Sequence, residues 1–222
     1  MGALSLIARD CFSLILEIEN GLEMQRQELA QRTDFSLSGA FFFFANSTQH
    51  KLNLDELKFG LERLEIRQDP TLLMVRYDAD EDGKLGLWEF GNIVLPLQQR
   101  MRAEIEGRQA CYEMSFETKS ILINVLRRSI DAEVEIEALR QRVCRDLTQP
   151  LKQVFESLDW LNRGFLSKGE FKRIIDQHCD GMEDLSNLHS VEMEALVRRF
   201  NKDRANGKVS LIEFVAELTP KI

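Results

Sequence analysis

One stretch of the sequence runs Asp78-Ala-Asp-Glu-Asp-Gly-Lys-Leu-Gly-Leu-Trp-Glu89. Asp78, Asp80 and Asp82 alternate with other residues, so their side chains can converge on one ion, and Glu89 supplies a further carboxylate. Gly83 provides the backbone freedom that a sharp turn requires. Carboxylates this close together repel one another unless a cation lies between them, and hard divalent cations prefer oxygen ligands. The stretch therefore predicts a cation-binding loop.

The alternative is a solvated acidic turn, but such a turn rarely has apolar residues on both sides and an inward-facing leucine. Here Tyr77 precedes the stretch, Phe90 follows it and Leu85 lies within it. The pattern resembles the twelve-residue calcium loop of the EF-hand superfamily, which includes calmodulin, troponin C and centrin. This resemblance implies one Ca²⁺ ion held by four side chains and, through its backbone carbonyl, a lysine: Asp78, Asp80, Asp82, Glu89 and Lys84.

A second loop of the same length precedes it at residues 45–56 and is called loop one; residues 78–89 are loop two. Loop one ends in Glu56 and has Leu52 at the inward eighth position, but Ala45 cannot bind a metal and His50 replaces the central glycine. We expect loop one to be metal-free. The run of four phenylalanines before it is either an exposed binding patch or part of a helical core, and cores are the commoner use.

The chain repeats itself with an offset of 114 residues, which indicates two copies of one structural unit. Each copy begins with a long helix, predicted at residues 3–32 and 115–147 from apolar residues at helical spacing. The offset relates these pairs: Glu19 and Glu133, Glu23 and Glu137, Arg26 and Arg140, Gln27 and Gln141, Phe41 and Phe155, Leu52 and Leu166, Glu56 and Glu170.

The second copy supplies loop three, residues 159–170, which keeps its glycine and its final glutamate but has Leu161 and Arg163 at the third and fifth positions. An arginine there can pair with Asp159 or Glu170 and replace the charge of the ion, so we expect no metal. Loop four, Asn201–Glu213, is one residue longer than the others. It leaves two interpretations open, a metal-free loop or a weak calcium site.

These observations predict an all-α fold with two lobes, each an EF-hand pair preceded by a long helix. The expected boundaries are 1–96 for the first lobe, 97–115 for a connector and 116–222 for the second lobe. By the resemblance, paired loops should be joined by a short β-bridge between their eighth positions, Leu52 with Leu85 and Leu166 with Val209.

Composition excludes several other classes of protein. The net charge is −8, and residues 1–98 carry 16 Asp and Glu against 9 Lys and Arg, so no basic face for nucleic acid is expected. No run reaches transmembrane length. The four cysteines form no CxxC pair, which favours free thiols and a cytoplasmic location. The histidines form no ligand or triad spacing and no phosphate loop is present, so we expect no enzyme.

Two functions remain. The first is a non-enzymatic calcium-binding structural module for protein partners, cytoskeletal or microtubule-associated, because the layout of long helix plus loop pair loosely resembles EF-hand proteins of protist cilia and axonemes. The second is a calmodulin-like or centrin-like sensor that binds partner helices on calcium loading. A sensor usually keeps several working loops, whereas this chain keeps one.

Overall fold

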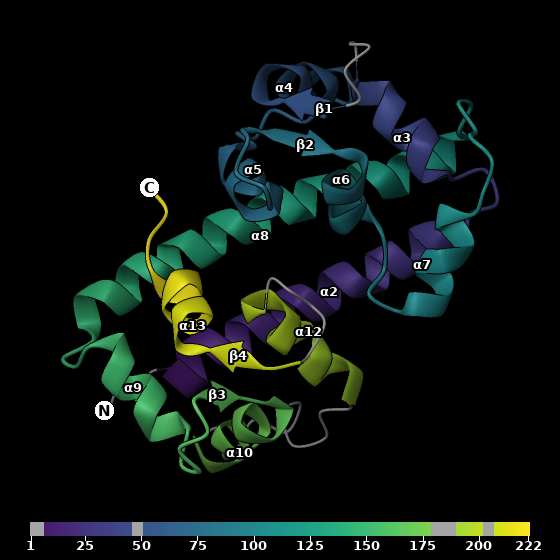
Figure 1. Cartoon of the computed structure of the whole chain (residues 1–222). Coiled ribbons are helices and arrows are strands. Elements are labelled where there is room, and N and C mark those ends of the chain that lie inside the picture. The colour runs from purple at the N-terminus through teal and green to yellow at the C-terminus, as the bar shows by residue number, and fades with distance from the viewer. Residues whose placement is uncertain (1–6, 46–50, 179–189, 202–206) are drawn as a thin grey trace. The chain divides into compact units, whose positions relative to one another are not determined.

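The computed structural model describes residues 7–45, 51–178, 190–201 and 207–222, and over these residues the chain is all-α with two short two-stranded sheets (Figure 1). This confirms the predicted fold class. The elements of the first copy are η1 (Ile7–Phe12, a π-helical segment), α2 (Ser13–Ala30), α3 (Leu37–Phe44), β1 (Lys51–Asn53), α4 (Leu54–Arg63), α5 (Thr71–Tyr77), β2 (Lys84–Gly86), α6 (Leu87–Val94) and α7 (Gln99–Glu106). Those of the second copy are α8 (Phe116–Asp146), α9 (Leu151–Leu158), β3 (Phe165–Leu166), α10 (Lys168–His178), α12 (Ser190–Phe200), β4 (Val209–Ser210) and α13 (Leu211–Leu218).

Both predicted β-bridges are present. Antiparallel β1 and β2 pair Leu52 with Leu85, and antiparallel β3 and β4 pair Leu166 with Val209. All four of these side chains are buried, because the eighth position of each loop points into the helical core. The bridges therefore join loop one to loop two and loop three to loop four.

Contacts divide the chain into two compact units that differ from the predicted ranges 1–96, 97–115 and 116–222. Gly21–Val134 forms the first unit, and Met1–Asn20 together with Glu135–Ile222 forms the second. Each long helix contributes one half to each unit. An apolar stripe identifies which residues are buried but not what they pack against, and so the sequence could not predict this exchange.

In the first unit, α8 packs into the same apolar cluster as the two loops. Its side chains Leu122, Val125 and Leu126 belong to the cluster that also holds Leu52 and Leu85. The run of four phenylalanines lies in α3 and has one buried face: Phe41 and Phe44 are buried, whereas Phe42 is exposed. The run is thus largely part of the core.

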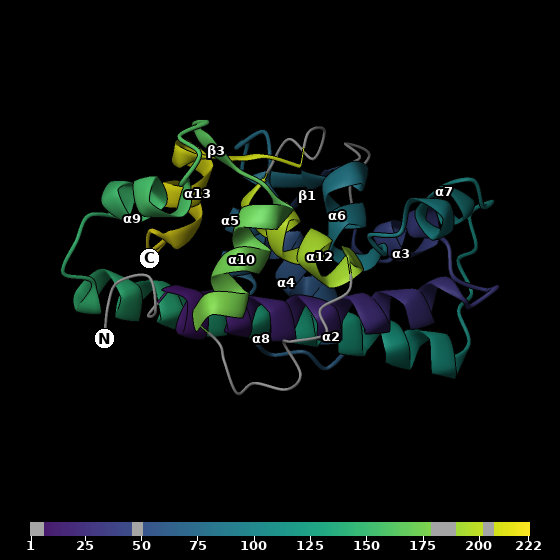
Figure 2. The same ribbon diagram turned by 90° about the horizontal axis from the view of Figure 1, so that it is seen from below.

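In the second unit, the start of the chain packs against the helices of the second copy. The Phe12 ring lies 5.0 Å from the ring of Phe171 in α10 and 6.0 Å from that of Phe200 in α12, measured between centroids. η1, drawn in dark purple, contacts α10, which lies next to it in Figure 2. Glu19 and Arg199, both buried, form an ion pair of 2.8 Å in the same unit.

One buried arginine and one buried glutamate in each long helix make the same kinds of hydrogen bond in the two copies, which explains why the repeat keeps them. In the first unit, Arg26 Nε donates to the Ile93 carbonyl (2.8 Å), and Glu23 accepts from the Leu97 N–H (2.8 Å). In the second unit, Arg140 Nε donates to the Glu217 carbonyl (2.7 Å), and Glu137 accepts from the Lys221 N–H (3.1 Å). These carbonyls belong to the last turns of α6 and α13, which lack helical partners. The long helices therefore satisfy backbone groups at the end of α6, which follows loop two, and of α13, which follows loop four.

The predicted connector, residues 97–115, is part of the first unit. It contains α7, whose Ile105 is buried in the core, and Arg108, whose guanidinium donates to the carbonyls of Ala30 (3.0 Å), Arg32 (2.6 Å) and Phe35 (3.1 Å). These bonds satisfy backbone groups at and beyond the end of α2.

Candidate metal centre

Loop two begins where α5 ends and continues through β2 into α6, so both of its ends are fixed by regular structure. Its turn needs left-handed backbone at two positions, Glu81 (φ 58°) and Gly83 (φ 78°). Glycine adopts this conformation without the steric penalty that other residues meet, which explains Gly83. The backbone therefore curls so that side chains before and after the turn face a common centre.

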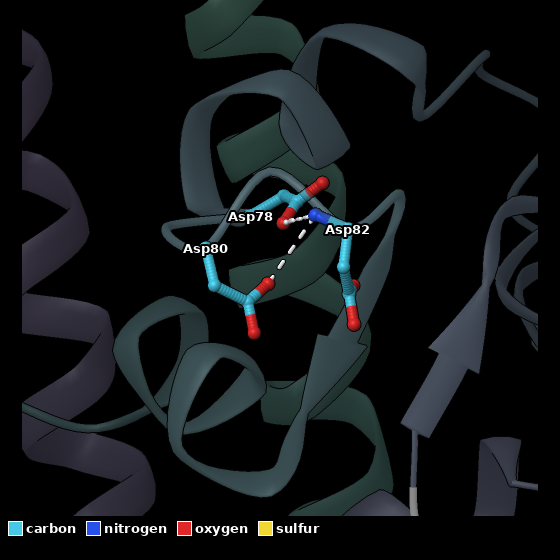
Figure 3. A group of neighbouring side chains, drawn as sticks. All are labelled: Asp78, Asp80 and Asp82. Carbon is cyan, nitrogen blue, oxygen red and sulfur yellow. Dashed lines mark hydrogen bonds between the residues drawn. The ribbon is translucent and has the colours of Figure 1, made fainter.

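The structure brings Asp78, Asp80 and Asp82 together. Each offers a carboxylate oxygen, and these oxygens all lie within 4.8 Å of one another. Figure 3 shows the three side chains around the turn, with the Asp82 N–H donating to Asp78 Oδ1 (3.2 Å) and Asp80 Oδ1 (3.3 Å). The cluster is accessible to ions, because Asp78 is only half-buried and the other two are exposed.

Backbone N–H groups hold the aspartates in this arrangement. Gly83 N donates to Asp78 Oδ2 (2.8 Å), and Lys84 N donates to Asp82 Oδ1 (2.9 Å). Hydrogen bonds to ionised carboxylates stabilise the charged form. The backbone of the loop therefore contributes to the placement of its carboxylates.

Glu89 lies apart from this group of three. It is buried, with Oε1 accepting from Ala79 N (2.7 Å) and Oε2 from Gly86 N (2.7 Å). To bind an ion with both oxygens, as the resemblance implies, its carboxylate would have to release or share these N–H groups. Lys84, the expected backbone ligand, lies in β2 opposite Asn53.

Lys51 contacts the cluster and was not found from the sequence. Its ammonium lies 2.9 Å from Asp80 Oδ2 and also forms an ion pair with Asp82. The hydrogen bonds that Lys51 donates to Asp82 and Asp80 raise the pKa of Lys51, and the bond to Asp80 lowers the pKa of that carboxyl group. The signal was available, because Lys51 precedes Leu52, whose bridge to loop two was predicted. The sequence does not show that the Lys51 side chain extends to the aspartates of loop two.

The donor set of loop two fits Ca²⁺. It consists of oxygens alone, which calcium prefers, and it already attracts a cationic group in the form of the Lys51 ammonium. Among the residues that the structure describes, no other group of three such side chains converges in this way.

Loop three contains the predicted pairing of its arginine with a carboxylate of the loop. Arg163 Nη2 donates to Glu170 Oε1 (2.5 Å), and Glu170 Oε2 accepts from Ser167 N (2.8 Å). Asp159 accepts from the N–H groups of Arg163 (3.0 Å) and Gly164 (2.6 Å). The pairing of Arg163 with Glu170 is confirmed.

Loops one and four offer fewer ligands within the described residues. The loop-one Glu56 accepts from Asn53 N (3.0 Å) in a capping box at the start of α4, and His50 lies outside the described residues. In loop four, Asn201 Nδ2 donates to the Lys208 carbonyl (2.9 Å) and Glu213 accepts from Ser210 N (2.8 Å). Residues 202–206, which include the other candidate ligands of that loop, lie outside the described residues.

The chain is similar to "Calcium-dependent protein kinase 8" of Arabidopsis thaliana, with 27% identity over 129 residues. The match covers 56% of this chain but only 24% of the kinase, so the chain spans about a quarter of that relative. No protein-family model matches the chain. Within the described part of the chain, no helix combines the length and apolar character needed to cross a membrane.

Proposed function

We propose that this chain is a non-enzymatic calcium-binding protein of the EF-hand superfamily, with one tight Ca²⁺ site at Asp78–Glu89. The observation that carries this proposal is the convergence of Asp78, Asp80 and Asp82 in a loop whose backbone N–H groups already hold them. The similarity to a calcium-dependent kinase supports the same ion. Loops one and three are proposed to be metal-free.

The role that we propose for this protein is structural. In the first unit α8 packs into the apolar cluster of the loop pair, and in the second unit Phe12 packs against Phe171 and Phe200. A calcium sensor exposes such an interior to a partner helix. Here the long helices of the chain itself occupy it, so calcium would rigidify the first unit rather than open a groove.

The setting that we propose is a cytoplasmic cytoskeletal assembly, such as a cilium or axoneme, with protein partners and without nucleic acid or membrane insertion. It rests on the repeated layout of a long helix before each loop pair. The alternative is a sensor in which α8 leaves the interior of the first unit and a partner helix takes its place.

Titration calorimetry tests the site. We expect one tight Ca²⁺ per chain, with at most one weaker ion at Asn201–Glu213. Three or four equivalent ions, or none, would contradict the proposal.

A hydrophobic dye and hydrogen exchange distinguish the two roles. Calcium at about 100 times its dissociation constant stabilises the native state by roughly 2.7 kcal/mol. Since only the first unit holds loop two, chelation should speed amide exchange in residues 21–134 and spare residues 135–222. Dye binding should hardly change. A large calcium-dependent rise in dye binding would support the sensor instead.

A further inference from the structure

We propose that Lys51 of loop one is a built-in counter-ion for loop two, which Ca²⁺ must displace, and that Lys51 thereby sets the calcium affinity of its neighbour. This inference rests on the proposed calcium site. It assigns a role to a metal-free loop that would otherwise contribute only its bridge residue.

The sheet register places Lys51 at the site. Lys51 pairs with Gly86 in the β1–β2 bridge, so its side chain starts beside loop two although it belongs to loop one. Its ammonium contacts Asp80 and Asp82, two of the three converging carboxylates. Lys51 is therefore held by the same fixed bridge that joins the two loops.

Ca²⁺ and the Lys51 ammonium are both attracted to the carboxylates of Asp80 and Asp82. The ammonium contacts Oδ2 of each aspartate, and an ammonium retained there would repel the divalent ion. We therefore expect calcium binding to break both ion pairs. All three side chains are more than one third exposed, so solvent screens the pairs and the effect is moderate.

Lys51 contacts two of the four expected carboxylate ligands of loop two, and the other two, Glu89 and Asp78, are bonded to backbone N–H groups. Glu89 bonds to the N–H groups of Ala79 and Gly86, and Asp78 bonds to those of Asp82 and Gly83. Lys51 is the cationic side chain that the described residues place against the loop-two aspartates. Its removal should leave the loop backbone unchanged while freeing two ligands.

Calcium titrations followed by Trp88 fluorescence test the inference on the full chain. Lys51→Met, which keeps an unbranched stem, should bind Ca²⁺ about three- to tenfold more tightly, or 0.7–1.4 kcal/mol. Lys51→Arg keeps the charge and should stay within about twofold of wild type. The matched control is Lys58→Met, because Lys58 pairs with Asp69 (3.3 Å) elsewhere in the same unit. It should also stay within about twofold.

A second measurement uses the wild-type chain and so does not depend on how a variant folds. Acylation of lysines, mapped by mass spectrometry, should modify Lys51 faster in calcium than in chelator, whereas Lys58 should react equally in both. Equal calcium affinity in wild type and Lys51→Met, or unchanged Lys51 acylation, would overturn the inference alone. Absence of calcium binding in both chains would overturn the proposed site and the inference with it.

Discussion

Loops two and three share left-handed backbone at the same two positions of the turn, but different cationic side chains contact their carboxylates. Both have left-handed residues at the fourth and sixth positions, Glu81 and Gly83 in one and Asn162 and Gly164 in the other. In both, the first aspartate accepts from the N–H groups of the fifth and sixth residues. In both loops, backbone bonds to the first carboxylate therefore hold the turn.

The two loops differ at the third and fifth positions. Loop two has Asp80 and Asp82 there, which the Lys51 ammonium of loop one contacts. Loop three has Leu161 and Arg163, and the Arg163 guanidinium pairs with Glu170 within the same loop. We therefore expect loop two to respond to calcium and loop three to be insensitive to it.

The largest effect should come from the last residue of each loop. Glu89→Gln removes the expected bidentate ligand, so the tight site should weaken at least about 100-fold, or 2.7 kcal/mol. Glu170→Gln is the matched control and should leave the calcium affinity unchanged. Titration calorimetry of the two variants measures this difference in calcium affinity. An equal loss of affinity in both variants would contradict the distinction between the loops.

Loop three should become a calcium site when its missing ligands are restored. In the double variant Leu161→Asp with Arg163→Asp, five oxygen donors are available, and the left-handed turn is already in place. Calorimetry should find a second ion per chain, bound more weakly than the first. A chain that still binds one ion would show that the backbone match is insufficient.

Removal of Arg163 alone should destabilise the second unit without creating a site. Arg163→Met leaves the buried Glu170 Oε1 without its charged partner, which we expect to cost about 1 kcal/mol after allowance for solvent screening. Arg145→Met is a suitable control because Arg145 pairs with Asp146 on the surface. Urea unfolding of both variants gives the difference, and calcium affinity should stay at the wild-type value.

The smallest expected effect is on the pH dependence of the stability of the folded chain, through Glu170 of loop three. Burial alone would raise the pKa of Glu170, but hydrogen bonds from Ser167 and the charge of Arg163 outweigh it and lower that pKa below 4.5. Ionised Glu170 therefore stabilises the folded chain at neutral pH, and this stabilisation is lost as the pH falls below about 4.5. Urea midpoints between pH 6 and 3.5 should fall less steeply in Arg163→Met than in wild type.

The parts of the fold that depend on local pattern could be predicted from the sequence. The long helices follow from the spacing of apolar residues, and the eighth-position bridges from the resemblance to the EF-hand loop. The position of Arg163 in its loop indicated a pair with Asp159 or Glu170, and the structure has the pair with Glu170. The converging aspartates follow from their alternate positions in loop two.

Contacts that depend on distant partners could not be predicted. Phe12 lies within the predicted first helix, but nothing in the sequence of that helix indicates that Phe171 and Phe200 are its partners. Glu23 and Arg26 were recognised as repeated residues, but their bonds to the end of α6 were not, because the partners are backbone groups. Lys51 was missed since its contact uses side-chain length rather than sequence spacing.

The exchange of helix halves has a consequence for how the chain folds during synthesis. The first unit is a continuous segment, Gly21–Val134, and can be completed while translation continues. The second unit must wait, because Glu19 pairs with Arg199, 180 residues later along the chain. At about 5–20 residues per second this interval is roughly 10–40 s, during which the buried side chains of residues 7–20, Phe12 among them, lack their partners in the second unit. That segment is therefore the expected binding site of chaperones on the nascent chain.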